Sequence, residues 1–224
     1  SGFCELLTPA SLWPMLAEVA GEKQLDALAK IIADPQKLGG ERPIPSVSRD
    51  DYRFSPDGTY WRGSIWMPKV YMTVKGLEKN GRQELADEVA RKMIFLQYRT
   101  WKNFEPHTIW ECYSPTKPEP ASAETHAHKC RPNFCGWSAL GPISIYIECV
   151  LGFHTVNAFE RRVEWSHPQE SWGKVGIKGL RFGDVKTDIL SDGKKCTVTS
   201  SAHYTLVIDG EEHKIAAGEN EITL

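Results

Sequence analysis

The sequence has no long apolar run, no excess of either charge and no cysteines in a CxxC spacing. Its longest apolar stretch, residues 143–153, is interrupted by Glu148 and falls well short of the roughly 20 residues that cross a bilayer. The 27 Lys and Arg residues stand against 29 Asp and Glu and are scattered, so no basic stripe is available for phosphate groups. We therefore expect neither a membrane nor a nucleic acid as partner.

The cysteines and histidines predict no metal site and imply no cofactor. The six cysteines stand at positions 4, 112, 130, 135, 149 and 196, a spacing that suits neither a zinc ribbon nor a dense disulfide framework. His126, His128 and Cys130 alternate, but no fourth ligand follows at a recognised spacing. No histidine lies at a known partner spacing from Cys112, which argues against a thiol nucleophile. Reduced structural thiols are the expectation.

The chain of 224 residues is long enough for one domain with a small appendage. Apolar residues recur at helical spacing in its first two thirds. Five helices are expected: from Thr8 to Gly21, around Leu25 to Ile32, from about Trp61 to Asn80, from about Arg82 to Leu96, and around Leu140 to Val150. Two long loops, 35–59 and 101–136, separate them, and loops of this length usually carry function.

After Phe153 the apolar period changes from 3.6 to 2. Val175, Ile177 and Leu180 alternate with other residues, and Asp192-Gly193 is a hairpin signal. The sequence therefore predicts two domains, a helical one over residues 1–153 and a small antiparallel β module over residues 154–224.

Three loop segments concentrate polar and aromatic residues: Tyr60-Trp61-Arg62-Gly63, Glu111-Cys112-Tyr113-Ser114-Pro115 and Pro132-Asn133-Phe134-Cys135-Gly136-Trp137-Ser138-Ala139. In order and spacing they resemble the YWRG, E-x-Y-x-P and PNF-x-WS segments of family 63 glycoside hydrolases and their mannosylglycerate-hydrolase-like relatives. The sequence departs from that pattern after Pro115, where Thr116-Lys117-Pro118 replaces the usual Thr-Gly.

The resemblance implies a mainly α fold, about half of an (α/α)6 barrel, in a glycosidase that hydrolyses α-linked glucosides or similar glycosides with inversion. It assigns the general base to Glu111. The family's acid is an aspartate in an upstream Gly- and Trp-rich segment that this chain does not contain. We therefore expect a fragment that carries the base, lacks the acid and is inactive by itself.

The chemistry supports Glu111 independently, because inversion needs one carboxylate to take a proton from water on the face opposite the leaving group. Arg62 can hold a sugar hydroxyl with its fork of donors, although it can instead pair with Asp51 or Asp57. Trp61 and Trp137 can form stacking walls. The remaining candidate contacts to substrate are Tyr60, Gly63 and Tyr113, and Trp66, one turn into the expected helix, is predicted to be a core residue.

Two other hypotheses compete with the enzyme fragment. One is a non-catalytic carbohydrate-binding or assembly module, and the other is a trehalase-like relative with another sugar. A truncated barrel would expose apolar helix faces, so we predict self-association or association with the missing N-terminal half. The chain starts abruptly at Ser1-Gly2, which suggests a piece of a longer protein. Its composition assigns no compartment, and the residues name neither the sugar nor the linkage.

Overall fold

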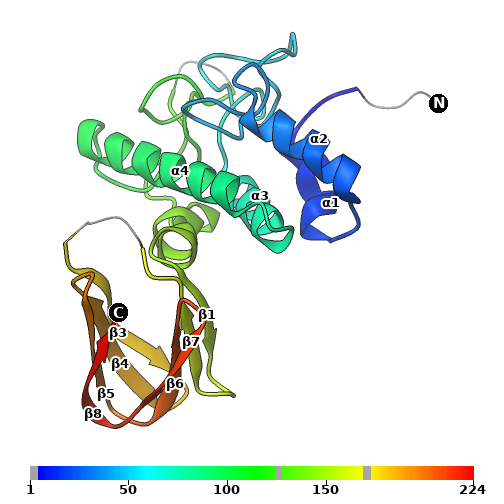
Figure 1. Cartoon of the computed structure of the whole chain (residues 1–224). Coiled ribbons are helices and arrows are strands. Elements are labelled where there is room, and N and C mark those ends of the chain that lie inside the picture. The colour runs from blue at the N-terminus through cyan, green and yellow to red at the C-terminus, as the bar shows by residue number, and fades with distance from the viewer. Residues whose placement is uncertain (1–4, 125–127, 169–172) are drawn as a thin grey trace. The chain divides into compact units, whose positions relative to one another are not determined.

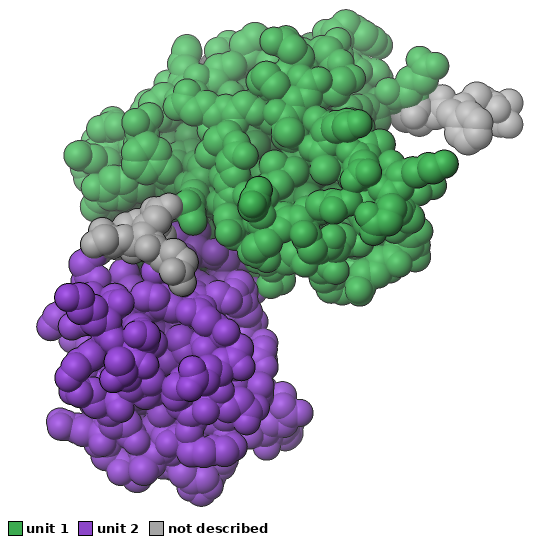
Figure 2. Space-filling model, in the orientation of Figure 1, with its two compact units in different colours: residues 1–146 green, residues 147–224 purple. Residues whose placement is uncertain are grey.

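The computed structural model describes residues 5–124, 128–168 and 173–224. The chain divides into two compact units, residues 1–146 and residues 147–224, which Figures 1 and 2 show. The first unit holds helices and long loops, and the eight strands found in the described residues lie in the second.

The helices have the following bounds: η1 Pro9–Leu12, α1 Trp13–Leu16, α2 Glu22–Ala33, α3 Met67–Lys79, α4 Gln83–Asn103, η2 Trp137–Leu140 and η3 Gly141–Val150. The Thr8 side chain caps η1 by accepting a hydrogen bond from the backbone N–H of Ala10 at 3.2 Å, as expected for Thr before Pro. Helix α3 packs against both α4 and α1. The apolar stripe read from the sequence in residues 67–79 faces these neighbours, since Val70, Val74 and Leu77 are fully buried.

The expectation that the third helix begins near Trp61 is wrong, because α3 begins at Met67. The backbone of Ile65 instead pairs with Tyr113 in an antiparallel bridge, through two hydrogen bonds of 2.9 and 3.0 Å. A residue that pairs in this way cannot also take helical dihedral angles. Pro68 then starts the helix, in the first turn where its missing N–H costs nothing.

The last helical segment is a π-helix, η3, entered through the short 3-10 helix η2. The sequence predicted a regular helix here. The boundary between the two units falls inside η3, between Tyr146 and Ile147.

The second unit contains two four-stranded sheets, with the orders β1-β2-β6-β7 and β3-β4-β5-β8. The strands are β1 Phe153–Asn157, β2 Arg162–Trp165, β3 Val175–Phe182, β4 Val185–Ser191, β5 Lys195–Ser200, β6 Tyr204–Ile208, β7 Glu211–Ile215 and β8 Gly218–Thr223. The expected antiparallel pairing holds except between β2 and β6, which run parallel. A local sequence pattern cannot predict that pairing, because β2 ends at Trp165 and β6 begins only at Tyr204. The chain between them forms β3, β4 and β5 of the other sheet.

One core joins the two sheets. Val163 and Leu206 come from the first sheet and Ile189 and Val198 from the second, and all four are fully buried in the same cluster. Trp165 stacks on Phe153 with its ring centroid 4.9 Å away, and its indole N–H donates to the backbone carbonyl of Leu151 at 2.7 Å. The unit is a β-sandwich whose inward residues are those that alternate in the sequence.

The mainly α description suits the first unit but is weak for the whole chain, because the described residues from Phe153 onward form strands, turns and connecting segments. In the described parts of the chain, no helix has the length and apolar character needed to cross a membrane.

Candidate active site

The two long loops of the first unit are joined by short antiparallel bridges. Ile65 bridges Pro45 on one side and Tyr113 on the other, and Tyr113 in turn bridges Pro120. A further bridge joins Ser122 to Lys129. Segments that are far apart in the sequence thus share one small irregular sheet, which fixes the loops that carry the three sequence motifs.

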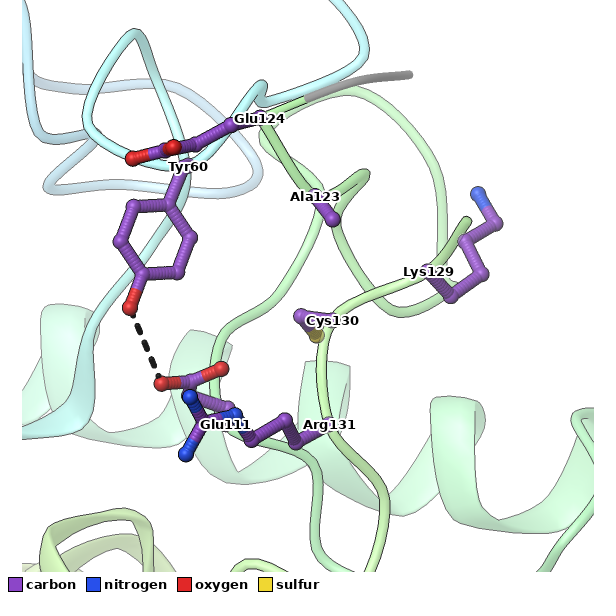
Figure 3. Close-up of a pocket in the computed structure, with 7 residues that line it drawn as sticks. All are labelled: Tyr60, Glu111, Ala123, Glu124, Lys129, Cys130 and Arg131. Carbon is purple, nitrogen blue, oxygen red and sulfur yellow. Dashed lines mark hydrogen bonds between the residues drawn. The ribbon is translucent and has the colours of Figure 1, made fainter. Parts of the chain in front are cut away.

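A pocket of about 350 Å³ opens among these loops. Figure 3 shows the side chains that line it: Tyr60, Glu111, Ala123, Glu124, Lys129, Cys130 and Arg131. Two of the predicted site residues, Tyr60 and Glu111, are brought together here.

Glu111 is held in place from its backbone outward. Its N–H donates to the carbonyl of Arg131 at 2.9 Å, and its own carbonyl accepts from the buried Ser138 hydroxyl at 2.7 Å. The side chain is only 4% exposed. Its Oε1 accepts a hydrogen bond from the phenol of Tyr60 at 3.2 Å, drawn dashed in Figure 3. A nearly buried carboxylate with a fixed orientation therefore reaches the pocket.

Tyr60 is positioned by an uncommon backbone conformation. Its φ is +46°, which is rare for a bulky residue, and its N–H donates to the carbonyl of Ser122 at 3.1 Å. Burial and the nearby Glu111 carboxylate raise the pKa of Tyr60. Its phenol consequently stays protonated and remains a donor to Glu111.

The pocket also contains charged residues that the sequence did not point out: Glu124, Lys129 and Arg131. Lys129 forms an ion pair with Glu119, with Nζ 2.9 Å from Oε1. In the sequence, Arg131 is marked only by its position directly before the third motif. The structure places it in the pocket through the hydrogen bond between its carbonyl and the N–H of Glu111.

Trp61, Trp66 and Trp137 form an aromatic cluster beside Tyr60. Trp61 stacks on Trp66 with ring centroids 4.1 Å apart and planes 10° from parallel, while Trp137 meets Trp66 edge-on at 5.9 Å. Trp66 is 1% exposed and is a core residue, as predicted, whereas Trp61 and Trp137 are 47% and 45% exposed. Two half-exposed indoles therefore pack against a buried one.

The other predicted contacts do not line this pocket: Trp61, Arg62, Gly63, Tyr113 and Trp137. Arg62 is exposed, and its Nε donates to the carbonyl of Arg53 at 3.1 Å. The alternative pairing of Arg62 with Asp51 is not what the structure shows, because Asp51 binds Arg53 at 2.8 Å.

Gly63 and Tyr113 hold the loops from inside. Gly63 has a φ of +135°, and a Cβ there would lie 2.8 Å from the carbonyl oxygen of Ser55. Tyr113 is buried, and its hydroxyl accepts hydrogen bonds from the Trp110 backbone N–H at 3.2 Å and from Gln97 at 3.1 Å.

Among the residues that the structure describes, no three His, Cys, Asp or Glu side chains gather as a metal site would require. His126 lies outside the described residues. None of the described cysteines is in a disulfide: Cys112, Cys130, Cys135, Cys149 and Cys196.

Residues 1–128 match the mannosylglycerate hydrolase MGH1-like glycoside hydrolase domain. An uncharacterised protein of Borreliella burgdorferi is 27% identical over 197 residues, which are 85% of this chain and 40% of that protein. The mannosyl-oligosaccharide glucosidase of Saccharomyces cerevisiae is 28% identical over 52% of this chain and 14% of its own length. The mannosylglycerate hydrolase MGH1 of Selaginella moellendorffii is 32% identical over 50% of this chain and 21% of its own length.

Solved structures resemble the fold. The GH63 mannosylglycerate hydrolase of Thermus thermophilus in complex with glucose has a TM-score of 0.50 at 21% identity, covering 64% of this chain and 31% of that one. A sialidase has a TM-score of 0.61 at 12% identity, covering 98% of this chain and 19% of that one. The chain spans 40% or less of the length of these curated relatives. By its family match, the chain belongs to the MGH1-like glycoside hydrolases, a group of GH63-like glycosidases.

Proposed function

We propose that this chain supplies the general-base side of an inverting α-glycosidase site, with Glu111 as the base. The observation that supports this most directly is the nearly buried Glu111 carboxylate, held by Tyr60 at the edge of an open pocket. The family match favours a glycosidase of this group over a trehalase-like relative.

In the proposed reaction, Glu111 takes a proton from a water molecule that attacks the anomeric carbon on the face opposite the leaving oxygen. A second carboxylic acid protonates that oxygen as the glycosidic bond breaks. The two carboxyl groups of an inverting site stand roughly 6.5–9.5 Å apart, so that the water fits between them. The Tyr60 phenol orients the Glu111 carboxylate for this step.

We propose that the acid comes from outside this chain. Within the described part of the pocket, the other carboxylate is Glu124, which is exposed to solvent and so lacks the burial that keeps a catalytic acid protonated. Since the curated relatives are at least twice as long as the matched region, an upstream aspartate fits the proposal. In this view the helical unit is about half of an (α/α)6 barrel.

We propose a saccharide with an α-linked glucose or mannose as substrate. Two relatives are named for a mannosyl-oligosaccharide and for mannosylglycerate. The half-exposed indoles of Trp61 and Trp137 offer apolar surface to a pyranose ring, although Lys69 Nζ lies over the Trp61 ring, 4.9 Å from its centroid. In this proposal Arg62, Gly63 and Tyr113 support the loops and do not contact the sugar.

Association with the missing half is part of the same proposal. Helix α4 exposes three aromatic side chains, Phe95, Tyr98 and Trp101, each about half exposed, which is unusual for a monomer's surface. Sedimentation should show either self-association of this chain or a complex with the N-terminal half. A stable monomer that does not bind the N-terminal half would contradict the association.

Glycosyl fluorides test the base without the acid, because fluoride leaves without protonation. We expect this chain to hydrolyse α-D-glucosyl or α-D-mannosyl fluoride slowly and to release the β-anomer first, measured by proton NMR. Glu111→Gln should lower the rate by at least about 100-fold. Glu124→Gln, in the same pocket, is the matched control and should change it little. Equal rates for Glu111→Gln and the native chain, or first release of the α-anomer, would contradict the proposal.

A non-catalytic carbohydrate-binding module is the second candidate function, favoured by the open indoles of Trp61 and Trp137. It predicts saturable binding of glucose or mannose without any turnover of the fluorides. The enzyme proposal predicts turnover that depends on Glu111.

A further inference from the structure

Two buried thiols lie next to the proposed base. Cys112 directly follows Glu111, and Cys130 directly precedes Arg131. The N–H of Glu111 donates to the carbonyl of Arg131, which joins the two segments at this point. The backbone of Ala121 bonds to both cysteines: its N–H donates to the carbonyl of Cys112 at 3.2 Å, and its carbonyl accepts from the N–H of Cys130 at 2.9 Å.

The side chain of Cys130 contacts Cys112 directly, because its Sγ donates to the backbone carbonyl of Cys112 at 3.0 Å. A disulfide needs the two sulfur atoms to approach to about 2.05 Å, and the Cys130 sulfur already lies against Cys112.

The two thiols differ in accessibility and in acidity. Cys130 lines the pocket, whereas Cys112 is fully buried behind it. The hydrogen bond with the Cys112 thiol lowers the pKa of Cys130, and the same hydrogen bond together with burial raises the pKa of Cys112. Because the thiolate is the reactive form, Cys130 is the thiol that reacts first with a small molecule in the pocket.

We propose that Cys130 and Cys112 are a modification site, at which a small hydroperoxide entering the pocket converts the two thiols into a reversible disulfide. The ligand class is peroxide because Cys130 is 3% exposed, which leaves room for a molecule such as hydrogen peroxide but excludes a bulky disulfide reagent.

The chemistry balances in two steps. The Cys130 sulfur attacks one peroxide oxygen, the O–O bond breaks, and the departing hydroxide takes up the thiol proton as water, which leaves Cys130 as a sulfenic acid. The Cys112 sulfur then attacks the Cys130 sulfur, the S–O bond breaks, and the hydroxyl leaves as a second water with the Cys112 proton. The two thiols lose two electrons and two protons, and the peroxide is reduced to two waters.

The disulfide would restrict the backbone beside the pocket. The new bond would join the segment of Glu111 to that of Arg131 at the adjacent residue pair and fix their spacing. Reduction of the bond back to two thiols would release this constraint.

Mass mapping of the whole folded chain tests the proposal without any catalytic assay. A Cys4→Ser, Cys135→Ser background removes two other thiols, including the exposed Cys135. After treatment with hydrogen peroxide, alkylation in denaturant and non-reducing digestion, we expect a linked peptide pair containing Cys112 and Cys130. Cys149 and Cys196, also buried, should remain alkylated, and dithiothreitol should restore both linked thiols.

Single variants assign the order of attack. In Cys112→Ser, Cys130 should accumulate as a sulfenic acid that dimedone traps, while in Cys130→Ser, Cys112 should stay a thiol. Cys196→Ser is the matched control and should form the disulfide as the background does. Absence of the linked pair in the folded chain, or its appearance only in urea, would overturn the proposal even if Glu111 proves to be the base.

Discussion

The side-chain amide of Gln97, on helix α4, donates a hydrogen bond of 3.1 Å to the hydroxyl of Tyr113, two residues after Glu111. The same amide lies 3.3 Å from the carbonyl of Ser138, whose hydroxyl holds the Glu111 backbone. One buried side chain on the scaffold thus connects both loop segments that fix the proposed base.

Gln97→Leu should therefore lower the free energy of unfolding. Its buried partners would lose a donor, which typically costs about 1–3 kcal/mol. Urea unfolding followed by circular dichroism measures this change. Gln83→Leu, on the exposed side of the same helix, is the control and should cost less than about 0.5 kcal/mol. Equal effects of the two substitutions would contradict the role of Gln97.

Gly141→Ala should be destabilising for a reason that involves the same side chain. A Cβ at Gly141 would lie only 1.7 Å from Oε1 of Gln97, so the amide would have to leave its position. The cost should shrink in a Gln97→Ala background, where the obstacle is absent. A double-mutant cycle by urea unfolding should give a coupling energy above about 0.5 kcal/mol, and additive effects would disprove this contact.

Tyr60→Phe should slow the Glu111-dependent hydrolysis of a glycosyl fluoride. A hydrogen bond to a charged group contributes about 1.5 kcal/mol or more, equivalent to roughly tenfold in rate. Because burial and Glu111 raise the pKa of Tyr60, its phenol should donate unchanged through neutral pH. Hydrolysis rates measured across pH check both the size of the loss and its independence of pH. Tyr52→Phe, at a highly exposed position, is the control. A native rate for Tyr60→Phe would contradict the contact's importance.

Trp61→Ala should weaken binding of glucose or mannose by about fivefold, since stacking on an indole contributes on the order of 1 kcal/mol. Titration by NMR measures the affinity. Trp101→Ala is a matched control, because Trp101 is 48% exposed and Trp61 is 47% exposed, yet Trp101 lies outside the aromatic cluster. Equal losses for both variants would rule out a specific platform.

Tyr204 should make the β-sandwich sensitive to alkali. Burial raises its pKa to about 12 from the ordinary value of 10.0. The stability from its neutral phenol is complete below pH 10.0 and is lost as pH rises from there toward about 12. Guanidinium unfolding at increasing pH should show this decline. In Tyr204→Phe the decline should be smaller. An identical decline would exclude Tyr204 as its cause.

Helix positions could be predicted from the sequence wherever local periodicity decides them, as in α2 and α4. The start of α3 could not, because the backbone of Ile65 pairs with Tyr113, far along the chain. The site divides in the same way. Glu111 stood out through its motif, whereas Arg131 and Lys129 join the pocket through backbone pairing between distant segments. Tyr113 and Gly63 belong to the same motifs, but a motif does not show which of its members are buried, as both are in the structure.

The parallel pair β2 and β6 has a consequence for the order of folding. Strands β3, β4 and β5 lie between them in the chain and belong to the other sheet, and neighbouring strands in that run are connected by short turns. Such local hairpins close at little entropic cost. Pairing β2 with β6 costs more entropy, because many more residues separate these two strands in the chain. The sheet that contains Trp165 should therefore be the later of the two to form during refolding.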